Sequence, residues 1–311
     1  MRLMPDSLDQ LRLRHYNATL ISVRDVHDRL RILRVRPDRA ASHFEPGQFA
    51  VLGLGAWERR CDGIRIGAGE ASERMIRRAY SMSCPLLDRQ GHLVTCEQCD
   101  FLEFYVALVS RPSDSPPALT PRLFFAVEGD RLFVGAKLGG DYTLSGVRAT
   151  DNILFVATGT GEAPHNAMLA RLLADSHRGR IVSITSVRHR RDLAYRREHR
   201  ELEKRYANYH YYCLITRESA AVTADAREVY GTRVQEFLAS GALERNEGSS
   251  IDPATWQVFL CGAPQMIGIP RKSSAGEWHF PEEPGMAELL VHRGFTLAGR
   301  DGGNIHFEKY W

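Results

Sequence analysis

The alternation of hydrophobic and polar residues divides the chain into two parts. From residue 16 to about residue 144, short apolar stretches are separated by turn residues such as Pro46-Gly47 and Gly129-Asp130, and no helical stretch intervenes. Many short strands without helices between them are typical of a barrel or a sandwich. The pattern predicts strands at residues 16–23, 31–36, 48–53, 78–83, 101–109 and 131–135.

The second part alternates between strands and helices. Residues 152–157 are almost wholly apolar, as expected of a strand that is buried on both faces. Such alternation indicates a parallel sheet covered by helices, so we place the boundary near residue 150, with domains at 1–149 and 150–311. The predicted strands are 152–157, 180–187, 209–215 and 256–261, and the predicted helices are 163–175, 192–206, 232–240 and 285–293.

Two segments interrupt the pattern and are predicted to be surface insertions. Residues 58–77 are mixed in charge and contain glycine, and residues 110–117 contain three prolines.

Composition narrows the functional classes. The 311 residues are 43% apolar and 25% charged, as in ordinary globular proteins, and no apolar stretch is long enough to span a membrane. The N-terminus lacks the apolar region of a signal peptide, so we expect a cytoplasmic protein. The six cysteines are too few for a disulfide scaffold. A net charge of +3 does not indicate a nucleic-acid binder, although it can help to steer an acidic protein partner.

The first cluster with chemical potential is Arg78-Ala79-Tyr80-Ser81, on a predicted strand of the first part. Arginine can pair with a pyrophosphate, tyrosine can lie against an aromatic ring, and serine can bond to a ring nitrogen. The alternative is an ordinary strand with alternating exposure.

The second cluster is the turn Gly159-Thr160-Gly161, which follows the first strand of the alternating part. Glycines at a strand-to-helix turn let the backbone approach a phosphate, and the helix N-terminus favours anions. Pro164 suits the first turn of that helix. The third glycine of the G-x-G-x-x-G pattern is absent, and a tight turn without a ligand is the alternative.

Two further clusters lie later in the chain. Cys261-Gly262-Ala263-Pro264 ends the fourth strand of the alternating part, at the edge where open α/β sheets bind ligands. A buried structural cysteine is the plainer interpretation. The chain ends in Tyr310-Trp311, two aromatic residues that need a surface to pack on, for which a flavin is one candidate.

In this order and at these intervals, the four clusters resemble the ferredoxin–NADP⁺ reductase family, and the likeness extends from Pro46 to Trp311. It is greatest for the bacterial branch, whose chains end in Tyr-Trp. The resemblance implies two domains: an antiparallel Greek-key β-barrel that binds FAD, then a Rossmann-like α/β domain with a parallel sheet that binds NADP(H). The C-terminal tail would return to the flavin.

By this resemblance, Arg78 binds the FAD pyrophosphate, Tyr80 packs beside the flavin and Ser81 hydrogen-bonds near flavin N5. Ser81, Cys261 and Tyr310 are the candidate catalytic residues. The implied FAD-binding residues are Arg78, Ala79, Tyr80, Ser81, Tyr105, Val106, Ala107, Leu108, Ala118, Leu119, Thr120, Thr160, Tyr310 and Trp311.

The resemblance also implies that Arg188, Arg217 and Arg233 bind the 2′-phosphate of NADP(H). Arginine matches a dianionic phosphate, and residues 188–191 are basic where an NAD enzyme would carry an acidic residue. A solvated surface is the alternative, most plausible for Arg190 and Arg191. The implied NADP-binding residues are Gly159, Thr160, Gly161, Pro164, Val187, Arg188, Thr216, Arg217, Arg233, Cys261, Gly262, Ala263, Pro264 and Gln265.

The implied activity is electron exchange between NADP(H) and ferredoxin or flavodoxin through FAD, by a monomer whose acidic partner binds transiently. One alternative is the reductase component of an oxygenase or of another electron-transfer chain. Another is a flavin-binding regulatory or electron-transfer subunit that does not use NADPH, for which the three arginines would have no purpose. No plant-type iron–sulfur motif is present, so we expect the electron partner to be a separate protein.

Three features depart from the family pattern. Glu162 stands where relatives carry a small or apolar residue; we expect it to point to solvent or to weaken NADPH binding by repulsion. Ala118 replaces a frequent glycine. Cys96 and Cys99, with Cys84 upstream, form a C-x-x-C arrangement that is either redox-active, part of a metal site that would also need His92, or inert. We assign no metal site.

Overall fold

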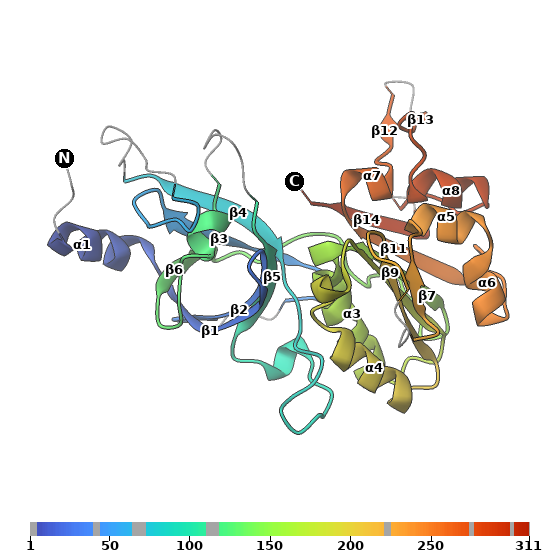
Figure 1. The fold of residues 1–311 in the computed structure, drawn as a ribbon, viewed down its shortest axis with the longest axis horizontal. Coiled ribbons are helices and arrows are strands. Elements are labelled where there is room, and N and C mark those ends of the chain that lie inside the picture. The colour runs from blue at the N-terminus through green and yellow to red at the C-terminus, as the bar shows by residue number, and fades with distance from the viewer. Residues whose placement is uncertain are drawn as a thin grey trace. The chain divides into compact units, whose positions relative to one another are not determined.

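The computed structural model describes residues 5–39, 44–63, 73–109, 118–220, 225–273, 277–298 and 302–310, with the side chains described from residue 8 onward. It divides into two compact units, residues 1–143 and 144–311 (Figure 1). The division lies a few residues before the boundary that the sequence pattern indicated. Among the described residues, no helix has both the length and the apolar character needed to cross a bilayer.

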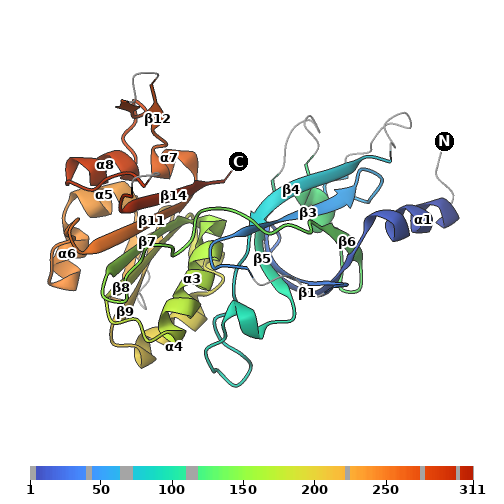
Figure 2. The same cartoon turned by 180° about the vertical axis from the view of Figure 1, so that it is seen from behind.

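The first unit is a six-stranded antiparallel barrel preceded by a helix (Figure 2). The strand order is β4-β3-β6-β1-β2-β5, and an isolated bridge between Ser83 and Glu103 joins the two edges. The confirmed barrel is packed by alternate residues such as Leu33, Leu52 and Phe104, all fully buried. Its elements are α1 (Pro5–His15), β1 (Ala18–His27), β2 (Leu30–Pro37), β3 (Phe49–Gly55), β4 (Met75–Ser81), β5 (Leu102–Ala107), α2 (Thr120–Leu123) and β6 (Arg131–Val134).

Helix α1 was not predicted, because it lacks a continuous apolar face: Leu11 is buried but Leu13 is 84% exposed. Polar contacts hold it instead. Arg12 Nη2 donates to Glu58 Oε2 at 2.8 Å, and Tyr16 OH, just after the helix, donates to Glu58 Oε1 at 3.0 Å.

The predicted insertion at residues 58–77 is wrong at both ends. Glu58 is largely enclosed by its contacts with Arg12 and Tyr16, and Met75–Arg77 belong to β4, where they pair with β3. Residues 64–72 of this segment, and the whole predicted insertion at 110–117, lie outside the described residues.

The second unit is built on a six-stranded parallel sheet, as the alternation predicted, with the order β10-β9-β8-β7-β11-β14. Helix α3 packs on one face, where His165 stacks on Phe155 at 4.8 Å. Helices α5, α6 and α8 pack on the other face, around Leu154 and Val156. The elements are β7 (Asn152–Thr158), α3 (Glu162–Ala174), β8 (Ile181–Val187), α4 (Arg196–Arg205), β9 (Tyr209–Ile215), β10 (Glu228–Tyr230), α5 (Val234–Ala239), α6 (Ala242–Glu247), β11 (Trp256–Gly262), α7 (Pro264–Ile267), β12 (Arg271–Lys272), β13 (Trp278–His279), α8 (Met286–His292) and β14 (Ile305–Lys309).

Candidate functional site

The sheet of the second unit reverses its order between β7 and β11. From β7 the chain proceeds outward through β8, β9 and β10, and it then returns to add β11 and β14 on the other side. In open α/β sheets, ligands bind beyond the carboxyl ends of the strands at such a point. The Gly159–Gly161 turn and Cys261-Gly262 lie there, as the sequence predicted.

Two glycines let the backbones of these turns touch. A Cβ atom on Gly161 would lie 2.2 Å from the Cys261 carbonyl oxygen, and one on Gly262, whose φ is +130°, would lie 2.2 Å from Thr158 Oγ1. Thr158 Oγ1 also accepts a hydrogen bond from Ala263 N at 2.8 Å. A Cβ atom on Gly159, whose φ is +52°, would meet nothing within 4 Å. The turns are thus packed tightly against each other while Gly159 faces open space, an arrangement that suits close approach by a nucleotide.

The C-terminal strand brings Tyr310 to the same edge. Tyr310 N donates to Gly262 O at 3.0 Å, and the phenol hydrogen-bonds the thiol of Cys261. Burial raises the pKa of Cys261 well above its ordinary value, and Glu308 adds to this. Cys261 is fully buried and therefore stays a thiol. Trp311 lies outside the described residues.

The pairing of β14 with β11 gives Cys261 a neighbour that the sequence did not single out. Glu308 on β14 pairs with Cys261 on β11, so its carboxylate comes to the end of the sheet where the two turns meet. Nothing in the sequence pattern marked Glu308, because β14 joins β11 only through the return of the chain.

Three exposed arginines surround the carboxyl ends of β8 and β9. Arg188 follows β8, Arg217 follows β9, and Arg233 directly precedes α5. Arg217 N donates to Arg188 O at 3.0 Å, so the two backbones are adjacent. Among the described residues, none of the three guanidinium groups has a carboxylate partner.

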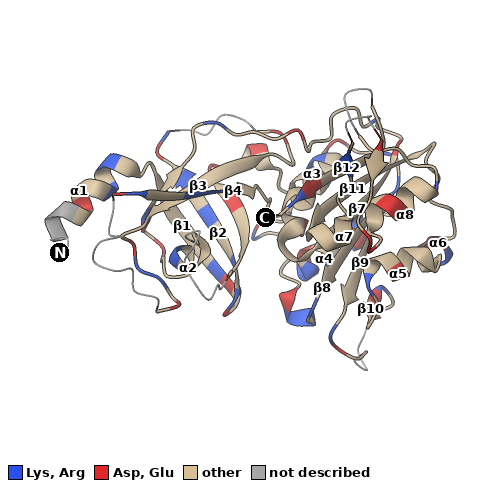
Figure 3. Ribbon diagram, turned by 90° about the horizontal axis from the view of Figure 1, so that it is seen from above, with Lys and Arg blue, Asp and Glu red and all other residues tan. Residues whose placement is uncertain are grey.

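Three other arginines in this unit are paired with carboxylates. Arg190 and Arg196 both pair with the buried Glu228, at 3.2 and 2.5 Å, and Arg227 pairs with Glu203 at 3.3 Å. Charges of both signs are interspersed along both units (Figure 3). The unpaired set is therefore a local feature, and it coincides with the arginines for which the sequence predicted phosphate contacts. Val187 and Thr216 join the two strand ends, since Thr216 N donates to Val187 O at 2.9 Å.

Glu162 does not point to solvent, which corrects one of the two expectations. It is 2% exposed and turns inward, where Thr185 Oγ1 and Tyr211 OH donate to its Oε1 atom at 2.9 and 2.7 Å. His199 Nε2 lies 3.2 Å from the same oxygen. Polar partners on the sheet and on α4 explain how a carboxylate fits a position that an apolar residue would suit.

In the first unit, the Arg78–Ser81 cluster occupies the end of the edge strand β4, as predicted. Arg78 and Ala79 are exposed, Tyr80 is half-buried, and Ser81 is buried. The Tyr80 ring meets Phe104 of β5 edge-on, at 6.5 Å and 76°. Burial raises the pKa of Tyr80, so the phenol stays neutral. The Arg78 side chain is exposed, and its Nη1 atom donates to the Arg77 carbonyl oxygen at 2.7 Å.

The other predicted flavin residues lie on the opposite edge strand and beside it. Tyr105 and Val106 are buried in β5, whereas Ala107 and Leu108, at its end, are half-buried. Ala118 and Leu119 lead into α2, and Thr120 Oγ1 accepts a hydrogen bond from Val109 N at 3.0 Å. Closure of the barrel places β4 and β5 together, and with them the two halves of the predicted flavin site.

The cysteine cluster lies between β4 and β5. A hydrogen bond with Cys84, together with burial, raises the pKa of Cys96 well above its ordinary value, and burial raises that of Cys99 to about 12. Such thiols are poor nucleophiles. His92, which a zinc site would need, bonds to Asp88 at 3.2 Å instead. Within the described part of the chain, no group of three or more His, Cys, Asp or Glu residues is arranged to hold a metal ion.

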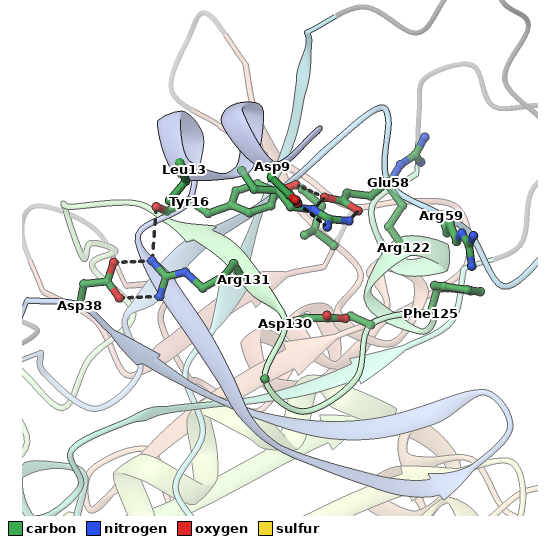
Figure 4. Close-up of a pocket in the computed structure, with 14 residues that line it drawn as sticks. Asp9, Leu13, Tyr16, Asp38, Glu58, Arg59, Arg122, Phe125, Asp130 and Arg131 are labelled. Atoms are coloured by element: carbon green, nitrogen blue, oxygen red, sulfur yellow. Dashed lines mark hydrogen bonds and ion pairs between the residues drawn. The ribbon is translucent and has the colours of Figure 1, made fainter. Parts of the chain in front are cut away.

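A cavity of about 610 Å³ lies between α1 and the barrel (Figure 4). Its charged groups are largely paired with each other, as in the contacts of Arg131 with Asp38 and of Arg12 with Glu58. The lining includes none of the predicted cofactor residues. We therefore do not assign it to the cofactor site.

Comparison with known proteins gives consistent matches. Residues 155–272 match the oxidoreductase NAD-binding domain family. Over 226 residues, the chain is 31% identical to the flavodoxin/ferredoxin–NADP reductase of Escherichia coli (strain K12), which covers 72% of this chain and 76% of that protein. It is 26% identical over 266 residues to the ferredoxin–NADP reductase of Azotobacter vinelandii, covering 83% of this chain and 84% of that protein.

The fold is also shared with a solved structure. A ferredoxin–NADP⁺ reductase from Neisseria gonorrhoeae, crystallised with bound FAD and NADP, superposes with a TM-score of 0.70 at 18% identity. The match covers 95% of this chain and 98% of that one. Both units therefore take part in the likeness.

Proposed function

The chain belongs to the flavodoxin/ferredoxin–NADP reductase family, and on that premise we propose how its residues divide the work of the reaction. It is an oxidoreductase that uses FAD and NADP(H), as the sequence resemblance predicted. When bound, FAD supplies hydride exchange with NADP(H) and single-electron exchange with a redox protein. The protein supplies binding, orientation and electrostatics.

The barrel unit holds FAD. Arg78 pairs with the pyrophosphate, Tyr80 lies against the flavin and Ser81 offers a hydroxyl near flavin N5. The exposure of Arg78 and the partial burial of Tyr80 support this assignment, because a cation must be reachable and a stacking ring must keep one face open. The other contacts come from residues 105–108 and 118–120, and Trp311 completes the set.

The α/β unit holds NADP(H) at the carboxyl ends of its strands. Gly159, Thr160 and Gly161 receive the pyrophosphate and nicotinamide, with Pro164 in the first turn of α3 behind them. Cys261, Gly262, Ala263, Pro264 and Gln265 form the facing wall. The observation that carries this proposal is the contact of the two glycine turns where the strand order reverses, with Gly159 facing open space.

Arg188, Arg217 and Arg233 select NADP(H) over NAD(H) by binding the 2′-phosphate. Their lack of carboxylate partners within the described residues supports this role, because three neighbouring arginines are already paired. A flavin subunit that does not use NADPH would have no use for this set.

Ser81, Cys261 and Tyr310 are the residues that we assign to the reacting rings. The Cys261 thiol stays protonated and hydrogen-bonded to Tyr310, so it shapes the nicotinamide pocket and does not attack the ring. Ser81 orients the reacting nitrogen through a hydrogen bond. No residue is assigned as a general acid or base.

The electron partner is a small acidic protein, ferredoxin or flavodoxin, that binds a monomeric reductase transiently. The net charge of +3 supports weak electrostatic steering of such a partner. All six cysteines are free, which fits a reducing compartment and supports a cytoplasmic location. A reductase component of an oxygenase would share fold and cofactors; the protein that accelerates turnover distinguishes the two.

Anaerobic titration of the FAD-loaded protein with NADPH and, separately, with NADH tests the proposal. We expect NADPH to bleach the flavin absorbance rapidly and NADH to bleach it slowly. A yellow protein that neither nucleotide bleaches would contradict the reductase assignment, and a colourless protein that cannot take up FAD would contradict the roles of Arg78, Tyr80 and Ser81.

A further inference from the structure

Glu162 is a buried carboxylate at the start of the helix that follows the glycine-rich turn. It is the residue next to Gly161 and the first of the thirteen residues of α3. Its three contacts come from three other elements: Thr185 on β8, Tyr211 on β9 and His199 on α4. The side chain therefore ties the turn to the sheet and to α4 at one oxygen atom.

His199 is as deeply buried as its neighbour, at 1% exposure. Its ring stacks on Tyr211 at 4.1 Å and 17°, and its Nδ1 atom lies 2.8 Å from Tyr209 OH. The Nε2 atom faces Glu162. These contacts hold the imidazole between Tyr209, Tyr211 and Glu162.

The charge beneath the turn depends on His199. Thr185 and Tyr211 bring neutral donors, and no lysine or arginine contacts Glu162 among the described residues, so His199 is the basic side chain beside the carboxyl group. With Glu162 ionised, the network carries a net negative charge when His199 is neutral and none when it is protonated.

The ionisable groups described beside the pair are paired or have strongly shifted pKa values. On α3, three residues after Glu162, burial lowers the pKa of His165 to about 3. Burial raises the pKa of Tyr209 and Tyr211 well above their ordinary values and that of Cys213 to about 12. On α4, Arg200 is paired with Glu203 and Asp225. Imidazole is the side chain among these whose charge ordinarily changes between about pH 5 and pH 8.

We propose that Glu162 and His199 form a proton-dependent counter-charge beneath the glycine-rich turn, and that protonation of His199 strengthens the binding of the NADP(H) pyrophosphate. The inference rests on the proposed nucleotide site at this turn. A carboxylate within about one helical turn of a pyrophosphate opposes it and competes for the positive end of the helix dipole. Neutralising that carboxylate removes the opposition. Glu162 and His199 are positioning residues, because they act through the turn.

Equilibrium binding of NADP⁺ to the FAD-loaded protein tests the proposal. The dissociation constant is measured from about pH 5.5 to pH 8.5 for the wild type and for Glu162→Gln, which keeps the shape of the side chain and removes its charge. At the upper end, we expect Glu162→Gln to bind NADP⁺ roughly tenfold more tightly than the wild type. At the acid end of the pH range, the ratio of the wild-type dissociation constant to that of Glu162→Gln should approach one. The 2′-phosphate also titrates, but it does so with every variant and cancels in the ratio.

Two further variants make the result specific. His199→Gln keeps the carboxylate but lacks the imidazole. It should therefore bind NADP⁺ weakly at every pH, and the ratio of its dissociation constant to that of Glu162→Gln should not change with pH. Asp175→Asn removes one negative charge at the other end of α3, where Asp175 pairs with Arg171, and should leave NADP⁺ binding unchanged. If Glu162→Gln does not fold, the ratio of the dissociation constants of the wild type and His199→Gln still tests the pH dependence.

A readout without cofactors checks the same pair. In urea unfolding of the cofactor-free protein, the coupling between Glu162→Gln and His199→Gln in a double-mutant cycle should grow as the pH falls and His199 is protonated. A ratio of dissociation constants that stays constant across pH would overturn the inference, as would unchanged binding in Glu162→Gln. A wild type that binds no NADP⁺ at any pH would instead contradict the proposed function.

Discussion

Charged side chains are paired differently at the two ends of the parallel sheet. At the amino end, Glu247 accepts from Tyr212 OH at 2.6 Å and contacts His210 at 2.7 Å and Arg180 at 3.2 Å. At the carboxyl end, Arg188 and Arg217 are exposed and have no carboxylate partner among the described residues. At the amino end the charged groups pair with each other within the fold. At the carboxyl end the two arginines are exposed to a ligand.

Glycine lets backbone segments pack closely at both ends of the sheet. At the carboxyl end, the turns after β7 and β11 touch through glycine backbones, with no room for a side chain on Gly161. At the amino end, Gly179 lies just before β8, and a Cβ atom there would lie 2.0 Å from the Asp151 carbonyl oxygen, so the loops before β7 and β8 pack as closely. The ends therefore differ in their charges and not in their backbone packing. We expect charge substitutions at the amino end to change stability alone, and those at the carboxyl end to change nucleotide binding.

Gly161→Ala should give the largest effect, because it breaks the carboxyl end. The new Cβ atom would lie 2.2 Å from the Cys261 carbonyl oxygen, so β11 or the turn must shift. We expect a loss of about 2–3 kcal/mol in unfolding free energy and roughly a hundredfold loss in kcat/KM for NADPH. Urea unfolding and steady-state kinetics measure the two.

The matched control is Gly159→Ala in the cofactor-free protein. Its Cβ atom meets nothing, so only its positive φ of +52° is unfavourable, at a cost of about 1–2 kcal/mol. Equal stability losses for the two alanine variants would show that close packing of the turns is not what Gly161 provides.

Glu247→Ala should damage the amino end and leave the reaction unaffected. Its side chain is 1% exposed, and its removal takes away the carboxylate that Tyr212 OH, His210 and Arg180 share, although Arg180 keeps its hydrogen bond to Ser249 Oγ. We expect a loss of about 3 kcal/mol in unfolding free energy with unchanged KM for NADPH. Glu201→Ala, which removes an exposed carboxylate on α4, should change stability by less than about 0.5 kcal/mol. A large rise in KM for Glu247→Ala would break the separation between the two ends.

The sheet could be read from the sequence because its central strands are apolar on both faces. Residues 209–215 were predicted to the residue, since Tyr209–Ile215 is bounded by polar turns and is buried throughout except for His210. Strands β10 and β14 were missed, because three-residue Glu228–Tyr230 and half-polar Ile305–Lys309 take their structure from pairing with β9 and β11. Helix α1 was missed because ion pairs anchor it.

The candidate site was predictable where local chemistry constrains the backbone. Gly161 and Gly262 are required by close contacts at the ends of strands, so their places after predicted strands, together with the family resemblance, located them. The surroundings of Glu162 were not predictable, since its partners Thr185, His199 and Tyr211 lie on three elements that only the fold brings together. The same holds for Glu308 beside Cys261.

Arg217→Ala should weaken NADPH binding at the carboxyl end of the sheet and leave the unfolding free energy unchanged. A hydrogen-bonded contact to a charged group contributes about 1.5–3 kcal/mol, so KM for NADPH should rise at least about tenfold while KM for NADH barely changes. Steady-state kinetics with both nucleotides measures the split. Arg227→Ala is the control, because Arg227 already pairs with Glu203. Equal rises for NADPH and NADH would refute the 2′-phosphate contact.

The smallest expected effect is a pH dependence of stability that belongs to the amino end. Burial alone would raise the pKa of Glu247, but the hydrogen bonds from His210 and Tyr212 and the charges of His210 and Arg180 outweigh it and hold the pKa below its ordinary value. A carboxylate whose pKa is lower in the folded state stabilises the fold above its unfolded pKa of about 4.5, and that contribution is lost as the pH falls through the folded pKa.

Urea unfolding of the cofactor-free protein from about pH 7 to pH 3 measures this contribution. The unfolding free energy of the wild type should fall more steeply in the acid range than that of Glu247→Gln, which cannot take up the proton. Arg217→Ala should follow the wild type throughout, because its partner is a ligand that is absent from the measurement. A wild type and a Glu247→Gln variant with parallel pH profiles would mean that the charge of Glu247 adds nothing to the fold, and pairing of charges would then not be what distinguishes the amino end of the sheet.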